Sequence, residues 1–498
     1  MSIRRTRSEF LKVVGAGTAW VTLLSMLGCE PDRRTRRLAP AQPNGVMTFR
    51  SRPDLSPPTV EVTTHAHDTT PGYVFVAPKK GVGQYGPMIL DDSGQLVWFR
   101  PLRDKDEYAM DFKVQSYRGQ PVLTWAEGRV VAGHGHDQYV VLDSSYREIT
   151  RLQAGNGYVG DHHEFLITPQ DTALLTIYAS TPADLSLVGG PRGGEVLDGI
   201  AQEVDISTGE VLFEWHSLDH VGLDESYRKA SKDSRWPFDY FHINSIDVDH
   251  DSNLLVSAKG TCTVYKINRS TGEVMWRLGG EKSDFNMGLG TRTAYQHDAR
   301  RQPDGNITIF DNGADPKVHD QSRAIVVKLD EDEMTATLLR EYTHPDRLLA
   351  GSQGNMQVLS NFNVFVGWGS EPVLSEFNSG GELLFSADFP TESESYRAFR
   401  FPWSGRPQDE PAIAAETGPE DEVTVYASWN GATEVATWQV LAGPGPERLE
   451  AVASAPRKGF ETAITLNTTE PYVRVQAKNA SGKVLGTSRA LRPRNQER

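Results

Sequence analysis

The sequence predicts an all-β protein made of a six-bladed β-propeller followed by a small immunoglobulin-like or fibronectin type III-like β-sandwich. Three observations support this fold class. One phrase, two strands joined by a tight polar turn, recurs along the chain. The 45 glycines and 29 prolines are spread over all 498 residues, which indicates many turns. Short strands with alternating apolar and polar residues resume after a proline-rich stretch near the C-terminus.

The composition is that of a soluble globular protein. Hydrophobic residues make up 38% of the chain and charged residues 23%. The formal net charge of −15 provides no broad basic surface, so we expect no binding to nucleic acid. The chain has 2 cysteines, Cys29 and Cys262, which are too few for a disulfide framework.

The first 29 residues have the three-part pattern of an export signal. A basic region precedes an apolar run from Val13 to Leu27, and Gly28-Cys29 follows. TRSEFLK resembles a twin-arginine signal with Ser8 in place of the second arginine, and LGC resembles a lipobox. We therefore predict export to the periplasm or cell surface and lipidation at Cys29, which would be the protein's only membrane contact. An uncleaved membrane anchor is the alternative.

Residues 72–402 are predicted to hold the six blades. The closest copies of the hairpin phrase are IAQEVDISTGEVLFEW, VYKINRSTGEVMWRLGG and VLSEFNSGGELLFSADF, and three looser copies lie between them or before them. A second phrase, a polar start followed by a β-rich strand, precedes most hairpins. Four-stranded units spaced about 50 residues apart are typical of propellers. Five or seven blades, or an irregular β-sandwich, remain alternatives.

Three further segments surround the predicted propeller. Residues 30–71 are predicted to be a flexible spacer because they contain RRTRR and several prolines. Residues 403–421 are predicted to be a proline-rich acidic linker. Residues 422–493 alternate apolar and polar residues in short strands and are predicted to form the β-sandwich.

His163, His242 and His297 stand at the polar start of three consecutive copies of the second phrase. Residues at one repeat position of a propeller point toward a common centre, so we predict that these histidines form a functional cluster. A neutral imidazole is a nucleophile near physiological pH, and neighbouring imidazoles can exchange protons.

Cationic and amide side chains follow the same strands. In an otherwise acidic protein they indicate a pocket for an oxyanion, whose charge they would stabilise during transfer. These candidate anion-binding residues are Lys259, Arg300, Arg301, Arg323, Arg397, Arg400, Asn244 and Asn312.

The motifs HHEF, FHINSIDVDHDSNLLVSAKG, YQHDARRQPDGNITIFDNG and GNMQVLSNFNVFVGWG resemble the arylsulfotransferase family of β-propellers over about residues 70–405. The resemblance implies sulfuryl transfer from a phenolic sulfate ester to a phenolic acceptor, without 3′-phosphoadenylyl sulfate or another cofactor. It implies a ping-pong reaction through a covalent sulfohistidine.

The resemblance also implies a role for each matching residue. His297 matches the nucleophile, and His163 and His242 match residues that handle protons and bind sulfate. His162 and Asn244 belong to the same two motifs. Lys259 stands where the family has an arginine, so a point charge replaces a planar fork that binds two oxygens. The substrate-binding set is then Asn244, Lys259, His162, Arg300, Asn312 and Arg323.

Two other functions remain open at the level of sequence. The histidines, with His162-His163-Glu164 and His134-Gly135-His136, would suit a metal-dependent hydrolase or lyase. Their cationic neighbours disfavour a metal, and we predict none. The lysine at position 259 would suit a propeller that binds ligands without catalysis. The HGH segment itself is predicted to be a turn.

Overall fold

The fold is described by a computed structural model that covers residues 45–495. The regular structure of this range consists of strands and three short 3-10 turns, η1 (Ser186–Val188), η2 (Ser217–Asp219) and η3 (Leu223–Glu225). The prediction of an all-β protein is confirmed. No helix among residues 45–495 is long and apolar enough to cross a membrane. The predicted export signal and Cys29 lie outside the described residues.

Apart from β17, strands β2 to β26 form successive groups of four antiparallel strands. The groups are β2 (Tyr73–Lys79), β3 (Met88–Leu90) and β4 (Leu96–Phe99) with β26 (Glu394–Phe401); β5 (Tyr108–Tyr117), β6 (Gln120–Val131), β7 (His134–Leu142) and β8 (Glu148–Leu152); β9 (Gly160–Ile167), β10 (Thr172–Ala183), β11 (Gly194–Asp205) and β12 (Val211–His216); β13 (Ile243–Val248), β14 (Leu254–Ala258), β15 (Thr263–Ile267) and β16 (Val274–Gly279); β18 (His297–Arg301), β19 (Ile307–Asp311), β20 (Arg323–Asp330) and β21 (Thr335–Tyr342); and β22 (Asn355–Val358), β23 (Val364–Gly367), β24 (Val373–Phe377) and β25 (Leu383–Asp388).

Three pairings join segments that are distant in sequence. Strand β26 pairs antiparallel with β2, so the last strand of this region completes the group that the first strands begin. A short strand β1 (Glu61–Thr64) pairs with β25, and β17 (Asn286–Met287) pairs with β21. One residue pair between β7 and β9 joins the second and third groups into a single sheet.

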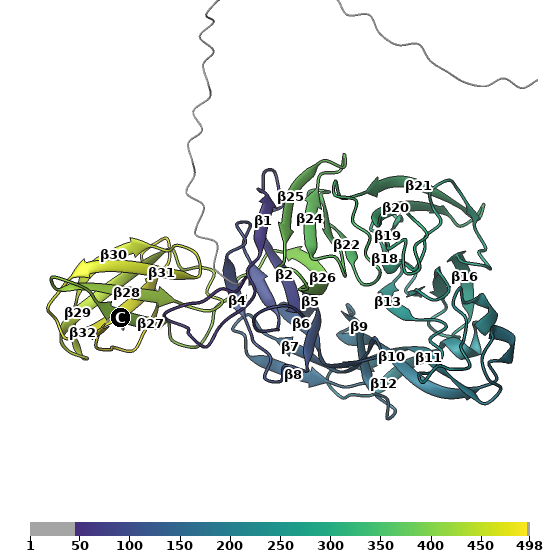
Figure 1. Ribbon diagram of the computed structural model, residues 1–498, viewed down its shortest axis with the longest axis horizontal. Helices are drawn as coiled ribbons and strands as arrows, with labels where there is room; N and C mark the ends of the chain where they lie inside the picture. The colour runs from purple at the N-terminus through teal and green to yellow at the C-terminus, as the bar shows by residue number, and fades with distance from the viewer. Residues whose placement is uncertain (1–44, 496–498) are drawn as a thin grey trace, which may run out of the picture. The chain divides into compact units, whose positions relative to one another are not determined.

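The first strands of the groups meet at a common centre. Strand β5 contacts β9, β9 contacts β13, β13 contacts β18, β18 contacts β22, and β22 contacts β26, which contacts β5 in turn. In Figure 1 these strands lie toward the middle, and the groups follow one another around them in chain order. The polar starts of the first strands are therefore brought together.

The cores lie between successive groups. One buried cluster combines Leu174 of β10 with Val256 of β14, and another combines Leu255 of β14 with Ile309 of β19. Alternation along a strand explains this arrangement, because neighbouring residues of β14 face opposite sides of their sheet. Each four-stranded group thus packs its two faces against the groups before and after it.

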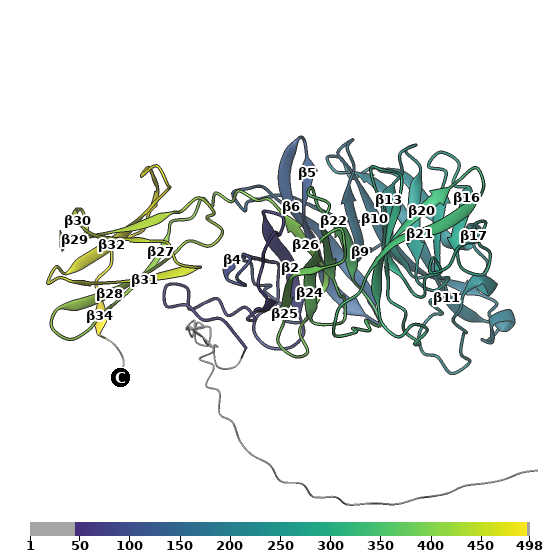
Figure 2. The same ribbon diagram turned by 90° about the horizontal axis from the view of Figure 1, so that it is seen from above.

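The C-terminal strands form two four-stranded sheets that share one core. Figure 2 separates β29, β30 and β32 in one layer from β28 and β31 in the other. The sheets consist of β27 (Ala412–Thr417), β28 (Glu422–Ser428), β31 (Glu461–Asn467) and β34 (Arg494–Asn495), and of β29 (Thr437–Gly445), β30 (Arg448–Pro456), β32 (Tyr472–Lys478) and β33 (Val484–Thr487).

Two segments predicted to lack structure carry strands instead. Strand β27 lies inside the predicted linker 403–421, because Ile413 and Ala415 alternate into the core despite the acidic and proline-rich surroundings. Strand β1 lies inside the predicted flexible spacer 30–71. In the same segment, the backbone N–H groups of Arg50 and Ser51 donate to the Glu461 carboxylate. The flexible-spacer prediction is therefore wrong for its described part.

Candidate active site

The pairing register places His163, Asn244 and His297 at equivalent points of their strands. Ile167 pairs with Ala173, Val248 with Leu254, and Arg301 with Ile307, so the three hairpins have the same register at this end. His163, Asn244 and His297 each lie four residues before the first member of these pairs. Tyr178, Lys259 and Asn312 each lie five residues after the second member.

His242 lies two residues before this shared position, which corrects the prediction that three histidines are in register. It nevertheless reaches the same centre, because its φ is 54° and β13 has an irregular register just beyond it. Register shifts also occur in β5, β9 and β18 close to the centre. Bulges of this kind re-aim side chains and are common next to active sites.

The histidine rings lie close enough to act together. The ring centres of His163 and His242 are 5.0 Å apart, and those of His242 and His297 are 6.4 Å apart. All three side chains are buried. The structure therefore brings the three predicted catalytic histidines into one cluster.

His297 is held by an amide. Its Nδ1 lies 2.7 Å from Oδ1 of Asn312, and the Asn312 Nδ2 donates to the backbone carbonyls of Ala350 and Gln353. Because Nδ2 is used by two acceptors, Oδ1 must be the atom that faces His297 and must accept the Nδ1 proton. The lone pair of His297 is therefore on Nε2, where it accepts the Gln353 backbone N–H at 3.2 Å.

His163 and His242 are held by carboxylates. The Nδ1 of His163 donates to Asp161 Oδ1 at 2.5 Å, and the Nδ1 of His242 donates to Asp239 Oδ2. Each Nε2 is then an acceptor in the neutral imidazole, and each ring can take up a proton opposite a carboxylate. Burial alone would raise the pKa of Asp161 and Asp239, but the adjacent histidines lower it.

The difference in partners separates the roles of the three imidazoles. Burial, the Lys259 ammonium and His242 all hold the pKa of His297 well below its ordinary value. Its amide partner adds no negative charge, so His297 stays neutral. His163 and His242 have a carboxylate to balance an imidazolium, although burial lowers the pKa of each. The arrangement fits one neutral nucleophile beside two proton carriers.

Lys259 supplies positive charge to this cluster. Its side chain is buried, and its Nζ donates to the Gly351 carbonyl at 3.0 Å. Burial and the nearby Arg228 guanidinium lower the pKa of Lys259 to about 8. The ammonium keeps donors beyond the one used by Gly351, which suits an oxyanion beside His297 and His242.

Asn244 and His162 differ in their contacts with the neighbouring residues. Asn244 Nδ2 donates to the Gln296 carbonyl at 2.8 Å, and its buried Oδ1 has no hydrogen-bond partner among residues 45–495. His162 stacks on His163 with a ring-centre distance of 4.4 Å and turns its Nδ1 toward Asp137 at 3.3 Å. His162 therefore packs against His163 and orients its ring, and we assign it no contact with the substrate.

Three predicted substrate-binding residues have other tasks. Arg300 donates to Asp298, Glu164 and the Ile246 carbonyl, and Arg323 donates to Asp311, Glu341 and the Arg292 carbonyl. Every guanidinium nitrogen of both arginines has an acceptor, because buried carboxylates next to the strands compete for them. Asn312 uses its amide to orient His297. These three side chains bind other protein groups in the structure, and their contact with an oxyanion stays a prediction.

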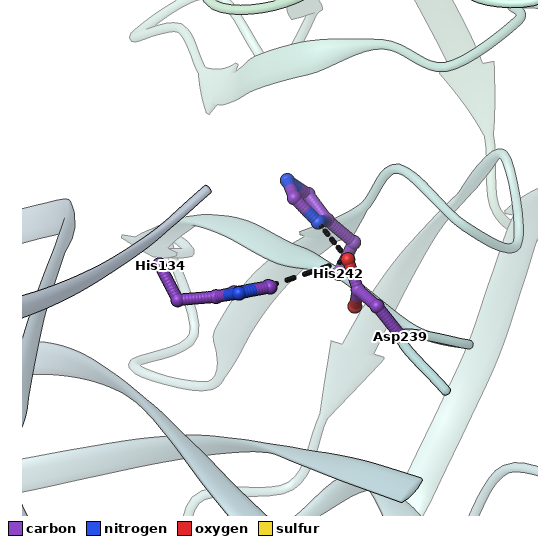
Figure 3. A group of neighbouring side chains, drawn as sticks. All are labelled: His134, Asp239 and His242. Carbon is purple, nitrogen blue, oxygen red and sulfur yellow. Dashed lines mark hydrogen bonds and ion pairs between the residues drawn. The ribbon is translucent and has the colours of Figure 1, made fainter. Parts of the chain in front are cut away.

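Four residues that sequence reasoning did not assign complete the cluster. His134, predicted in a turn, begins strand β7, and its Nε2 lies 3.3 Å from Asp239 Oδ2. Figure 3 shows His134 and His242 on the same carboxylate. Tyr178 and Tyr396 pack against His163 with ring-centre distances of 5.5 Å each. Of these four residues, only Asp239, three residues before His242, is close in the sequence to a predicted catalytic histidine.

The described residues contain two groups of three side chains whose donor atoms lie within 4.8 Å of one another. They are His134, Asp239 and His242, and Asp161, His162 and His163. These side chains are of the types that bind zinc. In both groups, however, the carboxylate already accepts imidazole protons, and an Arg228 nitrogen lies 4.0 Å from Asp239. The charges favour a proton network over a bound cation.

Comparisons with known proteins identify one family. The arylsulfotransferase (ASST) family matches residues 113–390, more than half of the chain. No curated protein matches the chain closely enough to count as a relative.

Several solved structures are similar at low identity. A protein of unknown function from Bacteroides caccae is 14% identical with a TM-score of 0.41, over 67% of this chain and 99% of that one. Virginiamycin B lyase from Staphylococcus aureus is 9% identical with a TM-score of 0.35, over 74% and 94%. Regucalcin from Agrobacterium tumefaciens is 12% identical with a TM-score of 0.30, over 62% and 79%.

Proposed function

The chain belongs to the arylsulfotransferase family, and on this premise we propose that it transfers a sulfuryl group between phenols through a sulfohistidine on His297. The observation that carries the proposal is the contact between His297 and Asn312. It fixes the imidazole in the tautomer whose Nε2 has the lone pair, and no carboxylate is present to protonate it. A neutral imidazole with its lone pair on Nε2 is the form that attacks sulfur, and the substrate would displace the Gln353 N–H from that lone pair.

The first half-reaction consumes the donor ester. His297 Nε2 attacks the sulfur of the aryl sulfate, the N–S bond forms, and the S–O bond to the aryl group breaks. The electron pair of that bond leaves with a phenolate, which is a tolerable leaving group because a phenol has a pKa near 10. An imidazolium at His242 or His163, balanced by Asp239 or Asp161, protonates the phenolate.

The second half-reaction returns the sulfuryl group to an acceptor. His242 or His163 takes the proton of the acceptor phenol, whose oxygen then bonds to sulfur. The N–S bond breaks, and its electron pair returns to His297 Nε2. One proton is taken from the acceptor and one is given to the donor's phenolate, so each cycle leaves the enzyme unchanged.

Lys259 is the side chain we assign to the sulfuryl oxygens, with Asn244 beside it. Lys259 is buried next to His297 and His242, where an ammonium is poorly solvated and attracts an anion strongly. The Gln353 N–H, which points at His297 Nε2 at 3.2 Å, is placed to donate to a sulfuryl oxygen once that nitrogen is bonded to sulfur. Small phenols and their sulfate esters are the only partners proposed, and no cofactor is needed.

We also propose the scaffold and location that go with this activity. The groups of four strands over residues 72–402 form a six-bladed β-propeller, which the contacts among the first strands support. The C-terminal sheets form an immunoglobulin-like or fibronectin type III-like sandwich, here with β27 included. The N-terminal signal leads to export and lipidation at Cys29, which membrane fractionation of the wild type and of Cys29→Ser tests.

The activity is tested with a chromogenic aryl sulfate in the presence and absence of a phenol. We expect chromophore release to require His297 and to rise with the phenol concentration. His297→Asn should remove it, whereas His65→Asn, at an exposed histidine, should not. Release from His297→Asn at the wild-type rate would refute the proposal.

A further inference from the structure

One carboxylate oxygen serves two imidazoles in this protein. Asp239 Oδ2 accepts from His242 Nδ1 and lies 3.3 Å from His134 Nε2. The three side chains come from two separate segments, since His134 begins β7 and both Asp239 and His242 precede β13. Both rings point at the carboxylate from different sides (Figure 3). Asp239 Oδ1 is buried without a hydrogen-bond partner among the described residues.

The His134 ring has a fixed position. It packs on Tyr178 of β10 with a ring-centre distance of 4.2 Å, and its centre is 5.6 Å from that of His242. Tyr178 also packs against His163 and His242. His134 therefore contacts His242 and the tyrosine that borders both proton carriers.

The charges around His134 favour its imidazolium. Burial alone would lower the pKa of His134, but the hydrogen bond and the charge of Asp239 raise it. Asp161 also favours the cation, and Arg228 opposes it. The pKa of His242 moves the other way, because burial lowers it and Lys259 and His134 add to that effect. Of the two imidazoles on this carboxylate, His134 holds a proton more strongly.

Resting on the proposed function, we propose that His134 is a positioning residue: with Asp239 it holds His242 as the neutral tautomer that accepts the acceptor's proton. His134 keeps the carboxylate ionised and fixed in direction. The carboxylate in turn keeps the proton of His242 on Nδ1. The lone pair is then on Nε2, where it is available to the substrate. The positive charge of His134 also limits how readily His242 is protonated by solvent.

Two substitutions separate the parts of this role. His134→Gln keeps an N–H donor for Asp239 and can never become a cation. His134→Phe removes the donor and keeps a ring against Tyr178. Without the His134 charge the pKa of His242 should rise, so the base form of His242 should be lost at higher pH than in the wild type. A neighbouring charge at this range shifts a pKa by about one unit.

The test follows the second half-reaction alone. Sulfo-enzyme prepared with excess aryl sulfate is mixed rapidly with a phenol, and the loss of the sulfohistidine is timed at pH values from 5 to 9. We expect the acidic limb to move upward by about one pH unit in His134→Gln. We expect the maximum rate to stay near the wild type in that variant and to fall about tenfold in His134→Phe. Limbs that coincide in all three proteins would overturn the inference.

A spectroscopic measurement keeps this inference separate from the proposed function. In protein with ¹⁵N-labelled histidine, the Nδ1 proton of His242 should resonate at low field because it lies on a carboxylate. Its titration should move to higher pH in His134→Gln. If the wild type forms no sulfohistidine, the proposed function fails, and this titration still decides the role of His134. An unchanged titration would show that His134 only fills space.

Discussion

His297 donates its Nδ1 proton to Asn312 Oδ1 over 2.7 Å, and no carboxylate takes that place. The other two histidines of the cluster donate to Asp161 and Asp239. An amide partner orients an imidazole and offers its cation only a hydrogen bond, whereas a carboxylate also supplies a negative charge. This one difference supports the proposal that His297 is the nucleophile and that His163 and His242 are the proton carriers, independently of the family's motifs.

Replacement of the amide by a carboxylate should make His297 easier to protonate. In Asn312→Asp the new charge would raise the lowered pKa of His297, and the nucleophile would be lost as pH falls through that raised value. We therefore expect transfer at pH 8 and a loss at pH 6 that the wild type does not show. Asn312→Ala is the matched control. It should slow transfer about 100-fold at both pH values, because orientation alone is lost.

Lys259 should make activity sensitive to alkaline pH. The ammonium is present below its pKa of about 8 and is lost above it, so anion binding should weaken from pH 8 upward. Lys259→Arg stays charged over this range, so its donor KM should increase less steeply with pH than the donor KM of the wild type. Lys259→Met should raise the donor KM at every pH. Parallel pH profiles for lysine and arginine would exclude a direct role for the ammonium.

Removal of metal ions should leave the reaction unchanged. The carboxylates of both three-residue groups already accept imidazole protons, so the proposed reaction requires no ion there. We expect dialysis against a chelator to preserve the rate of transfer. A loss of activity that zinc restores would favour the metal-dependent hydrolase, in particular if aryl sulfate is then cleaved without a phenol.

Arg397 should be required for stability. Its side chain is fully buried, and it pairs with Asp111, Glu164 and Asp298 beneath the histidines. Arg397→Met would remove one of the cations that these carboxylates share with Lys113 and Arg300, and should lower the free energy of unfolding by about 3 kcal/mol. Denaturant unfolding measures this change. Arg406→Met, which breaks an exposed pair with Glu434, should change it little.

The sequence supported much of the fold because the hairpins are locally encoded. The Ser-Thr-Gly turns and alternating strands follow from neighbouring residues, and the strands occur where the phrases predicted them. Strand β1 was missed because its partner, β25, lies far away in the chain. Strand β27 pairs with the next strand, β28, but its short apolar alternation is flanked by proline and acidic residues that favour a linker. Nothing local distinguishes such a segment from a spacer.

The site was predictable only in part for the same reason. His163, His242 and His297 belong to repeated phrases, so their proximity could be predicted from the sequence. Arg300 could not be assigned, because Glu164, which takes its guanidinium, becomes its neighbour only after folding. His134 belongs to a different group of strands and reaches Asp239 across the centre. His242 lies two residues before the expected register and still reaches the cluster, with a φ of 54° that the sequence did not reveal.

The most direct test of whether His297 is the nucleophile is to locate the covalent modification. Wild-type protein is incubated with an aryl sulfate and no phenol, digested at alkaline pH, and mapped by mass spectrometry. We predict one sulfuryl group per chain on the peptide that contains His297, removed when a phenol is added before digestion. Transfer to the phenol without any modified peptide, or with the group on His163 or His242, would contradict the assignment of His297 as the nucleophile.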